Sequence, residues 1–193
     1  MLEFIVTFGF IGKIKIAPGT FGSLAAFVFM YFMLSLISRY HILSFVNNYL
    51  AIDEIALVFC FFLAMLVLLF IIGAMASSKY VEKYSKHADP KEVVIDEVVG
   101  QMLTSILCFF GAVMISQTAI AQNIDSSVLN FIFVFLLPFV LFRIFDIFKP
   151  WPIDYIDSNI KGGLGIMLDD LLAAIFAAVT FYALIFCIIN FYH

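Results

Sequence analysis

Five long apolar stretches constrain the fold of this chain more than any other feature of its sequence. A helix needs roughly 20 apolar residues to cross a hydrocarbon core about 30 Å thick. Five stretches reach or approach this length: residues 21–38, 55–76, 98–116, 128–145 and 171–192. Charged residues make up 12% of the chain, about half of the roughly 25% found in soluble domains. The sequence therefore predicts an all-α, multi-pass membrane helix bundle of about five transmembrane helices, with residues 1–193 forming a single domain.

The charged residues are distributed unevenly between the two sides of such a bundle. Nine of the ten Lys and Arg residues fall in three segments that five spans place on one side, namely the N-terminal segment, residues 77–97 and residues 143–170. Eleven of the fourteen acidic residues lie in the same segments. Because positively charged loops face the cytoplasm, the sequence predicts a site at the cytoplasmic edge of the membrane and His193 on the other side. No basic block indicates a nucleic-acid partner.

The first polar motif is APGTFGSLAA, at residues 17–26. Pro18 and Gly19 favour a turn, and Thr20 or Ser23 can cap the helix that follows. Exposed N–H groups at a helix start, together with these hydroxyls, form a suitable cradle for phosphate. The alternative is a helix cap without a ligand. The absence of GxxxxGK[ST] excludes an ATP-type P-loop.

Two pairs of adjacent carboxylates form the most specific pattern. VVIDEVVGQM places Asp96 and Glu97 where the third apolar stretch begins, and GGLGIMLDD places Asp169 and Asp170 where the last one begins, after a flexible glycine loop. A helix start favours acidic residues by only about 0.3–1 kcal/mol, which is the alternative explanation. Mg²⁺ takes carboxylate oxygens as ligands. The two pairs therefore predict a divalent metal site.

The third motif is FRIFDIFKPWP, at residues 142–152. Arg143, Asp146 and Lys149 recur at every third residue and are expected to form one polar ridge on a helix, which Pro150 ends before Pro152 keeps the chain extended. Arg offers a planar fork that matches phosphate, and Lys offers a point charge. The alternative is an internal ion network that anchors the helix at the membrane interface.

Carboxylates, a metal, two cations and a Gly/Thr/Ser segment together indicate a site that handles phosphate. The chain has no CxxxxxR loop and no DxD motif, and its histidines, His41, His87 and His193, lie outside every motif. What remains is hydrolysis by a metal-activated water with an acidic residue as the base. The spacing does not decide which carboxylate is the base.

The four motifs together resemble those of the phosphatidylglycerophosphatase A family. The matching sequences are APGTFGSLAA, DEVVG, FRIFDIFKPWPI and, from Asp157, D-x-N-x-x-GGLGIMLDD, in this order within residues 17–174. The resemblance implies a multi-pass enzyme of the bacterial plasma (inner) membrane that uses Mg²⁺ to convert phosphatidylglycerophosphate to phosphatidylglycerol. It implies a metal set of Asp96, Glu97, Asp146, Asp169 and Asp170, of which Asp96, Glu97, Asp146 and Asp170 are also catalytic. It implies a phosphate-binding set of Thr20, Ser23, Arg143 and Lys149.

Two departures from the family pattern affect backbone and packing more than chemistry. They are Lys15, where members often have proline, and Ala174, where they tend to have glycine.

One alternative function is a phosphatase for another lipid phosphate, such as phosphatidate or undecaprenyl diphosphate. The other is a small divalent-cation transporter, although transporter sites usually lie near the bilayer midplane. Residues 77–92 are expected to be a solvated connector made of a helix and a turn.

Overall fold

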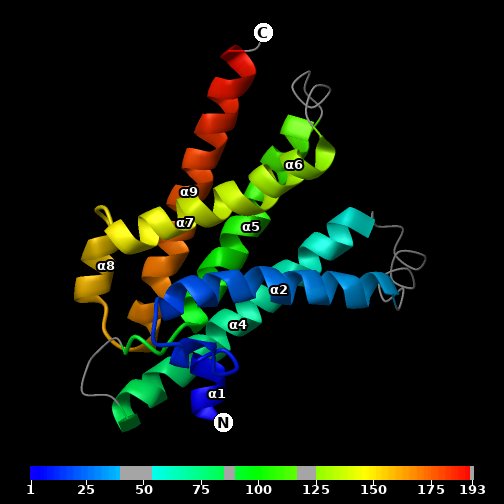
Figure 1. Cartoon of the computed structure of the whole chain (residues 1–193). Coiled ribbons are helices and arrows are strands. Elements are labelled where there is room, and N and C mark those ends of the chain that lie inside the picture. Colours follow the sequence, from blue (N-terminus) through cyan, green and yellow to red (C-terminus); the bar gives the residue numbers. More distant parts are fainter. Residues whose placement is uncertain (40–53, 85–89, 117–124, 192–193) are drawn as a thin grey trace.

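Helices form the regular structure of the residues that the computed structural model describes, which are 1–39, 54–84, 90–116 and 125–191 (Figure 1). They are, in chain order, α1 (Leu2–Val6), the 3₁₀ helix η1 (Ile11–Lys13), α2 (Pro18–Arg39), α4 (Glu54–Tyr84), α5 (Ile95–Ser116), α6 (Ser126–Asn130), the π-helical segment η3 (Phe131–Leu136), α7 (Leu137–Phe148), α8 (Ile153–Asn159) and α9 (Gly163–Phe191). These described ranges contain no strand, so the all-α prediction is confirmed. The three histidines, His41, His87 and His193, lie outside them.

Five helical segments of the described chain are long and apolar enough to cross a membrane, as predicted. They are Pro18–Arg39, Ile55–Tyr84, Ile95–Ser116, Ser126–Phe148 and Gly163–Phe191. Two helices extend well beyond their apolar stretches: α4 continues to Tyr84, and α9 already begins at Gly163. Hydropathy marks only the part of a helix that lies in lipid, so it cannot report these polar extensions.

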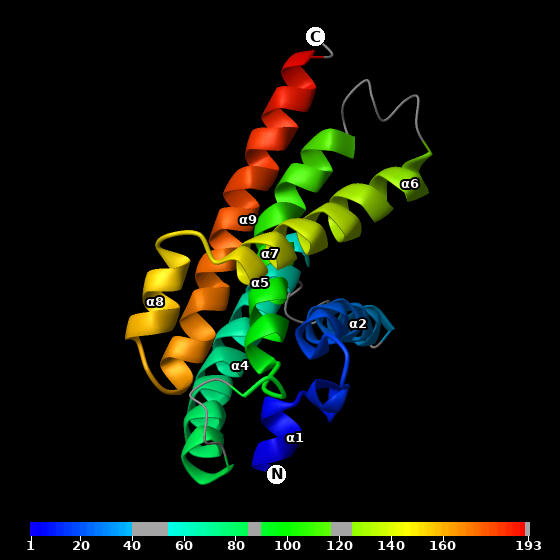
Figure 2. The same ribbon diagram turned by 60° about the vertical axis from the view of Figure 1, so that its left-hand side comes forward.

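Helix α5 is the centre of the bundle. In its most apolar window 61% of the residues are buried, against 11% in α4, and α9 runs beside it (Figure 2). Gly100 explains the close packing, because a Cβ there would lie 2.7 Å from the Phe142 ring of α7 and 3.0 Å from the Asp170 carbonyl oxygen of α9. The missing side chain therefore brings the acidic turns of α5 and α9 together with α7.

The fourth membrane-crossing segment is continuous but not uniformly α-helical. It runs from α6 through η3 into α7, and Pro138 lies at the start of α7. Proline has no N–H to donate, and its ring collides with the carbonyl four residues earlier in a regular α-helix. A wider π-helical turn directly before Pro138 accommodates this ring without ending the helix.

The chain turns sharply between α7 and α8, where Pro150 and Pro152 lie. The prediction that Pro150 ends the preceding helix is confirmed, because α7 ends at Phe148. The prediction that Pro152 keeps the chain extended is wrong: its backbone has φ −94° and ψ 7°, and α8 begins at the next residue, Ile153. A proline is compatible with a helix start because its missing N–H would have no intrahelical partner there.

Candidate active site

Charged side chains from three helices and two connecting segments surround one cavity, at the end of the bundle where α2, α5 and α9 begin. The cavity has a volume of about 240 Å³. Five carboxylates and three cations line it: Asp96 and Glu97 from α5, Asp146 and Arg143 from α7, Asp169 and Asp170 from α9, Lys149 from the turn after α7, and Lys91 from the segment before α5. The structure thus brings together the five carboxylates and the two cations that the sequence analysis singles out.

Three of the carboxylates form a tight cluster. Asp96, Glu97 and Asp170 each place one oxygen within 4.8 Å of the others. Asp170 is only 2% exposed, and one oxygen of Glu97, of Asp169 and of Asp170 is buried with no hydrogen-bond partner in the described structure. Buried polar groups normally have such partners, because desolvation otherwise destabilises the fold. A hard divalent cation takes carboxylate oxygens as ligands, so these residues fit a metal ion.

Arg143 and Asp146 share one ridge of α7, as predicted. Arg143 Nη1 lies 2.5 Å from Asp146 Oδ2 and donates a hydrogen bond of 3.4 Å to Ser23 Oγ. The Nε atom of Arg143 is buried and has no partner within the described structure. Asp146 and Ser23 therefore fix the guanidinium in place, while one of its donors stays available to an anion.

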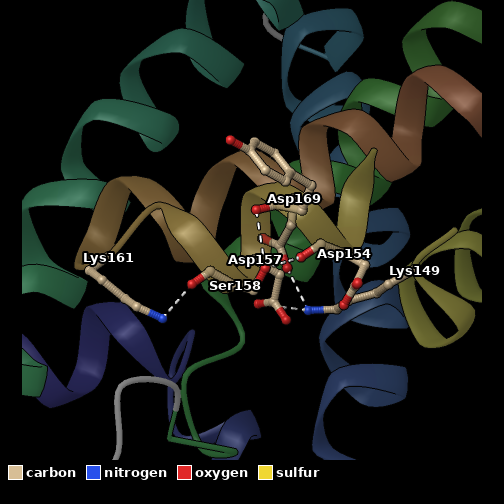
Figure 3. Close-up of polar contacts among 7 residues, drawn as sticks. Lys149, Asp154, Asp157, Ser158, Lys161 and Asp169 are labelled. Carbon is tan, nitrogen blue, oxygen red and sulfur yellow. Dashed lines mark hydrogen bonds and ion pairs between the residues drawn. The ribbon is translucent and has the colours of Figure 1, made fainter. Parts of the chain in front are cut away.

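Lys149 does not share that ridge, so the predicted three-residue ridge is wrong at its last member. Lys149 lies just after α7 with a left-handed backbone (φ 41°), because Pro150 cannot continue the helix. Its Nζ lies 2.6 Å from Asp169 Oδ2 and 3.1 Å from Asp157 Oδ1 (Figure 3). Burial lowers the pKa of Lys149, but its hydrogen bonds and ion pairs with Asp169 and Asp157 outweigh burial and raise this pKa above its usual value. The ammonium group is therefore charged at neutral pH.

Asp169 and Asp170 lie in the second turn of α9, so the prediction that they open the last helix is wrong. The helix begins at Gly163, inside the stretch predicted to be a flexible loop. A Cβ at Gly163 would collide with the Ala74 carbonyl of α4, and the Gly163 N–H donates a 2.8 Å hydrogen bond to Ser78 Oγ of the same helix. Close docking on α4 thus satisfies a donor at the start of α9 and extends the helix through the glycines.

Thr20 and Ser23 lie inside α2, so neither of them caps it. The helix begins at Pro18, a residue well suited to the first helical position. Ser23 is fully buried, and its hydroxyl donates a 3.1 Å hydrogen bond to the Gly19 carbonyl. Pro18 and Gly19 line the cavity, whereas Thr20 and Ser23 do not. A Cβ at Gly19 would collide with the Glu97 carboxylate, so α2 approaches the acidic cluster with its backbone.

Three further residues of this region are given no role by the sequence analysis. Asp157 pairs with Lys149, and Lys91 lines the cavity. Gln101 lies one turn beyond Glu97 on α5, is fully buried, and has no hydrogen-bond partner for either amide atom within the described structure. Asp157 could have been found from its place in the last motif, whereas no local pattern distinguishes Lys91 or Gln101.

Residues 77–92 are more than a solvated connector in the part that the structure describes. Residues 77–84 continue α4. Tyr80 is buried, and its hydroxyl donates a 2.7 Å hydrogen bond to Glu92 Oε1. This contact holds the end of α4 to the segment that leads into α5 and that contributes Lys91 to the cavity.

Fold and cavity together define a multi-pass membrane protein with a buried acidic and cationic site at one end of its bundle. The sequence profile of the family described as Phosphatidylglycerophosphatase A matches residues 4–185, and the chain belongs to this family. It is therefore a phosphatase, a hydrolase that acts on a phosphomonoester.

Named relatives cover most of the chain. Phosphatidylglycerophosphatase A of Haemophilus influenzae is 34% identical over 90% of this chain and 82% of the relative. The protein of the same name in Escherichia coli is 30% identical over 89% of this chain and 76% of the relative. A Bacteroides thetaiotaomicron protein, provisionally named phosphatidylinositol-3-phosphatase, is 31% identical over 84% of this chain and 80% of the relative. No solved structure matches the chain.

Proposed function

We propose that this protein hydrolyses phosphatidylglycerophosphate to phosphatidylglycerol and inorganic phosphate, with Mg²⁺, at the cytoplasmic face of the bacterial plasma membrane. The observation that carries the proposal is the cavity, in which a buried carboxylate cluster lies with Arg143 and Lys149. The names of the Haemophilus and Escherichia relatives indicate the lipid. The excess of Lys and Arg in the segments on the cavity side supports the cytoplasmic orientation.

Asp96, Glu97 and Asp170 would hold the metal, because their oxygens lie close together. Glu97 and Asp170 each also have a buried oxygen without a hydrogen-bond partner in the part of the chain that the structure describes. When bound there, Mg²⁺ supplies positive charge that offsets the charge on the phosphate and makes a bound water more acidic. Asp146 and Asp169 are paired with Arg143 and Lys149 and have a different task. They hold the two cations in position around the same cavity.

The reaction exchanges one bond at phosphorus for another. Arg143 and Lys149 bind the phosphate oxygens and stabilise the charge that grows on them in the transition state. The oxygen of a water molecule forms a bond to phosphorus as the bond to the glycerol oxygen breaks. A carboxylate of the cavity accepts the proton that the water loses, and the leaving glycerol oxygen takes up a proton. The products are phosphatidylglycerol and inorganic phosphate.

A phosphatase for another lipid phosphate is the second candidate, and the name of the Bacteroides relative favours it. The cavity binds phosphate and metal in the same way whichever alcohol carries the phosphate. A divalent-cation transporter is disfavoured, because the carboxylates of the cavity lie at one end of the bundle, whereas transporter sites usually lie near the bilayer midplane.

Phosphate release from purified protein tests the proposal. Phosphatidylglycerophosphate, phosphatidate and phosphatidylinositol 3-phosphate are offered separately in detergent micelles, with Mg²⁺ or with excess chelator. We expect phosphatidylglycerophosphate to be hydrolysed fastest and its hydrolysis to stop in chelator and return with Mg²⁺. Faster hydrolysis of either other lipid would assign the substrate differently, and full activity in chelator would exclude the metal. Asp154→Asn, an exposed carboxylate of α8 that does not line the cavity, is the matched control for Asp170→Asn.

The orientation has its own test. A periplasm-specific reporter fused after His193 is expected to be active, and a cytoplasm-specific reporter at the same point is expected to be inactive. The opposite result would place the cavity on the outer face of the membrane.

A further inference from the structure

A second cavity, of about 630 Å³, lies between α2, α4, α5 and η3, away from the acidic residues. Apolar and aromatic side chains form most of its wall, among them Phe27, Met30 and Leu34 of α2, Phe59 of α4, and Phe135 of η3. It is more than twice the volume of the polar cavity and shares no lining residue with it. A cavity of this composition takes a hydrocarbon rather than a headgroup.

One face of α2 leads from the polar cavity to the apolar one. Gly19 lines the first, Ser23 is buried one turn later, and Phe27 and Met30 line the second. Residues three and four apart share a face of a helix, so these four positions lie along one face of α2. Where this face reaches the apolar cavity, the Phe27 ring contacts the Phe135 ring, with centroids 4.4 Å apart. This contact packs α2 against η3.

Gln101 occupies the corresponding place on α5. Glu97 lines the polar cavity and Ser105 lines the apolar one, and Gln101 lies four residues from each. Its side chain is fully buried, and neither amide atom has a hydrogen-bond partner in the described structure. A buried amide without partners destabilises the fold, so a ligand that offers acceptors to its N–H groups is the expected partner at this position.

We propose that one acyl chain of the lipid phosphate occupies the apolar cavity and that Gln101 hydrogen-bonds the glycerol-ester linkage between phosphate and chain. This inference rests on the proposed function, because it needs a lipid whose phosphate lies in the polar cavity. Phe27 and Ser38 mark the extent of the apolar cavity along α2. The eleven rises from Phe27 to Ser38 span about 16.5 Å at 1.5 Å per residue, close to the roughly 15 Å of one leaflet of a 30 Å hydrocarbon core. The cavity is therefore long enough for one chain.

Variants that fill the cavity test the acyl-chain site. Leu34→Trp and Ser105→Phe each add volume to its wall from a different helix. We expect either one to lower kcat/KM about 10-fold for a dipalmitoyl lipid phosphate and to leave a dihexanoyl lipid phosphate unaffected. Val28→Trp is the matched control, because Val28 is 69% exposed on α2 and does not line the cavity. Equal effects of the filling variants on both lipids, or no effect on either, would overturn the site.

A second measurement does not depend on turnover. A non-hydrolysable phosphonate analogue with a diazirine at the end of one acyl chain is photolysed with the wild-type protein. We expect labelling to concentrate on the peptides that contain Met30 and Phe59. A phosphatidylcholine with the same diazirine should label the exposed helix faces instead, and matching patterns for the two probes would overturn the proposal. Labelling at the cavity without release of phosphate from any lipid would reject the proposed function and keep the acyl-chain site.

Gln101→Leu tests the linkage contact, because leucine keeps the size of the side chain and removes its polar atoms. We expect kcat/KM to fall about 10-fold for diacyl substrate and to be unchanged for the deacylated headgroup phosphate, since only the former has the ester. The melting temperature should stay equal or rise, because a buried amide without partners is removed. Equal losses of kcat/KM on both substrates, or wild-type activity on the diacyl lipid, would show that Gln101 does not contact the ester linkage.

Discussion

The two acidic pairs of the polar cavity are used differently. Asp96 and Glu97 lie in the first turn of α5, and both belong to the carboxylate cluster. Asp169 and Asp170 lie in the second turn of α9 and are divided between two partners. Successive residues of a helix point about 100° apart, so Asp170 reaches the cluster while Asp169 bonds Lys149. The same pattern of adjacent carboxylates therefore places two members in the cluster from one helix, and from another helix one member in the cluster and one beside a cation.

The largest effect is expected from Asp170→Asn, which removes the member of the second pair that joins the cluster. The amide keeps the shape but not the negative charge that a hard cation requires. We expect the turnover number to fall by about 10³-fold or more and Mg²⁺ binding, measured by calorimetry, to be lost. Asp154→Asn should leave both values unchanged. Normal Mg²⁺ affinity in Asp170→Asn would show that the second pair contributes no ligand.

Arg143→Lys tests the surroundings of the first pair, Asp96 and Glu97, because the side chains of Arg143 and Glu97 both lie against Gly19. A point charge cannot replace the planar fork that contacts Asp146 and, in the proposed function, a phosphate as well. We expect the turnover number to fall by about 10²–10³-fold with normal membrane insertion and unchanged Mg²⁺ affinity. Wild-type turnover would mean that Arg143 only anchors α7 at the membrane interface.

Asp169→Asn tests whether Asp169 and Asp170 have different tasks, with Asp169 holding Lys149 and Asp170 belonging to the carboxylate cluster. Lys149 would lose its nearer partner, 2.6 Å from Nζ, but keep Asp157. We expect a 10–100-fold loss of turnover, which is typical when a group that orients a site residue is removed, with Mg²⁺ affinity close to that of the wild type. Loss of Mg²⁺ affinity equal to that in Asp170→Asn would contradict the division of labour and make Asp169 a metal ligand.

The smallest effect is expected from Asp157→Asn. This carboxylate is the more exposed of the two partners of Lys149 and lies farther from Nζ, at 3.1 Å. Exposed ion pairs contribute about 0.2–1 kcal/mol, so turnover should fall only a few-fold. A loss as large as that of Asp169→Asn would show that both carboxylates hold Lys149 equally.

The features that the sequence predicts correctly depend on composition over many residues or on short local patterns. The five membrane-crossing helices follow from hydropathy, and the helix start at Asp96 and Glu97 follows from two charges directly before an apolar stretch. The five carboxylates of the cavity, together with Arg143 and Lys149, could be named because few polar residues interrupt an apolar chain. Each of these signals lies within one segment, so it does not depend on how distant segments pack.

The features that the sequence does not predict depend on contacts between distant residues. The glycines before Asp169 have the local signature of a loop, yet Gly163 is helical because it docks on Ser78, 85 residues away. Lys149 was expected on the ridge of Arg143, but Pro150 ends the helix and the side chain pairs with Asp169 on another helix. No periodicity within a segment contains that information.

The buried oxygens of Glu97, Asp169 and Asp170 that lack hydrogen-bond partners among the described residues have a consequence for the stability of the whole protein. They raise the free energy of the folded chain on its own, so any cation that binds only the folded form shifts the unfolding equilibrium. At a concentration 100 times its Kd, such a ligand adds about 2.7 kcal/mol. If Mg²⁺ binds the cluster as proposed, the lifetime of this protein in detergent depends on the buffer, and a preparation made in Mg²⁺ outlasts one made in chelator.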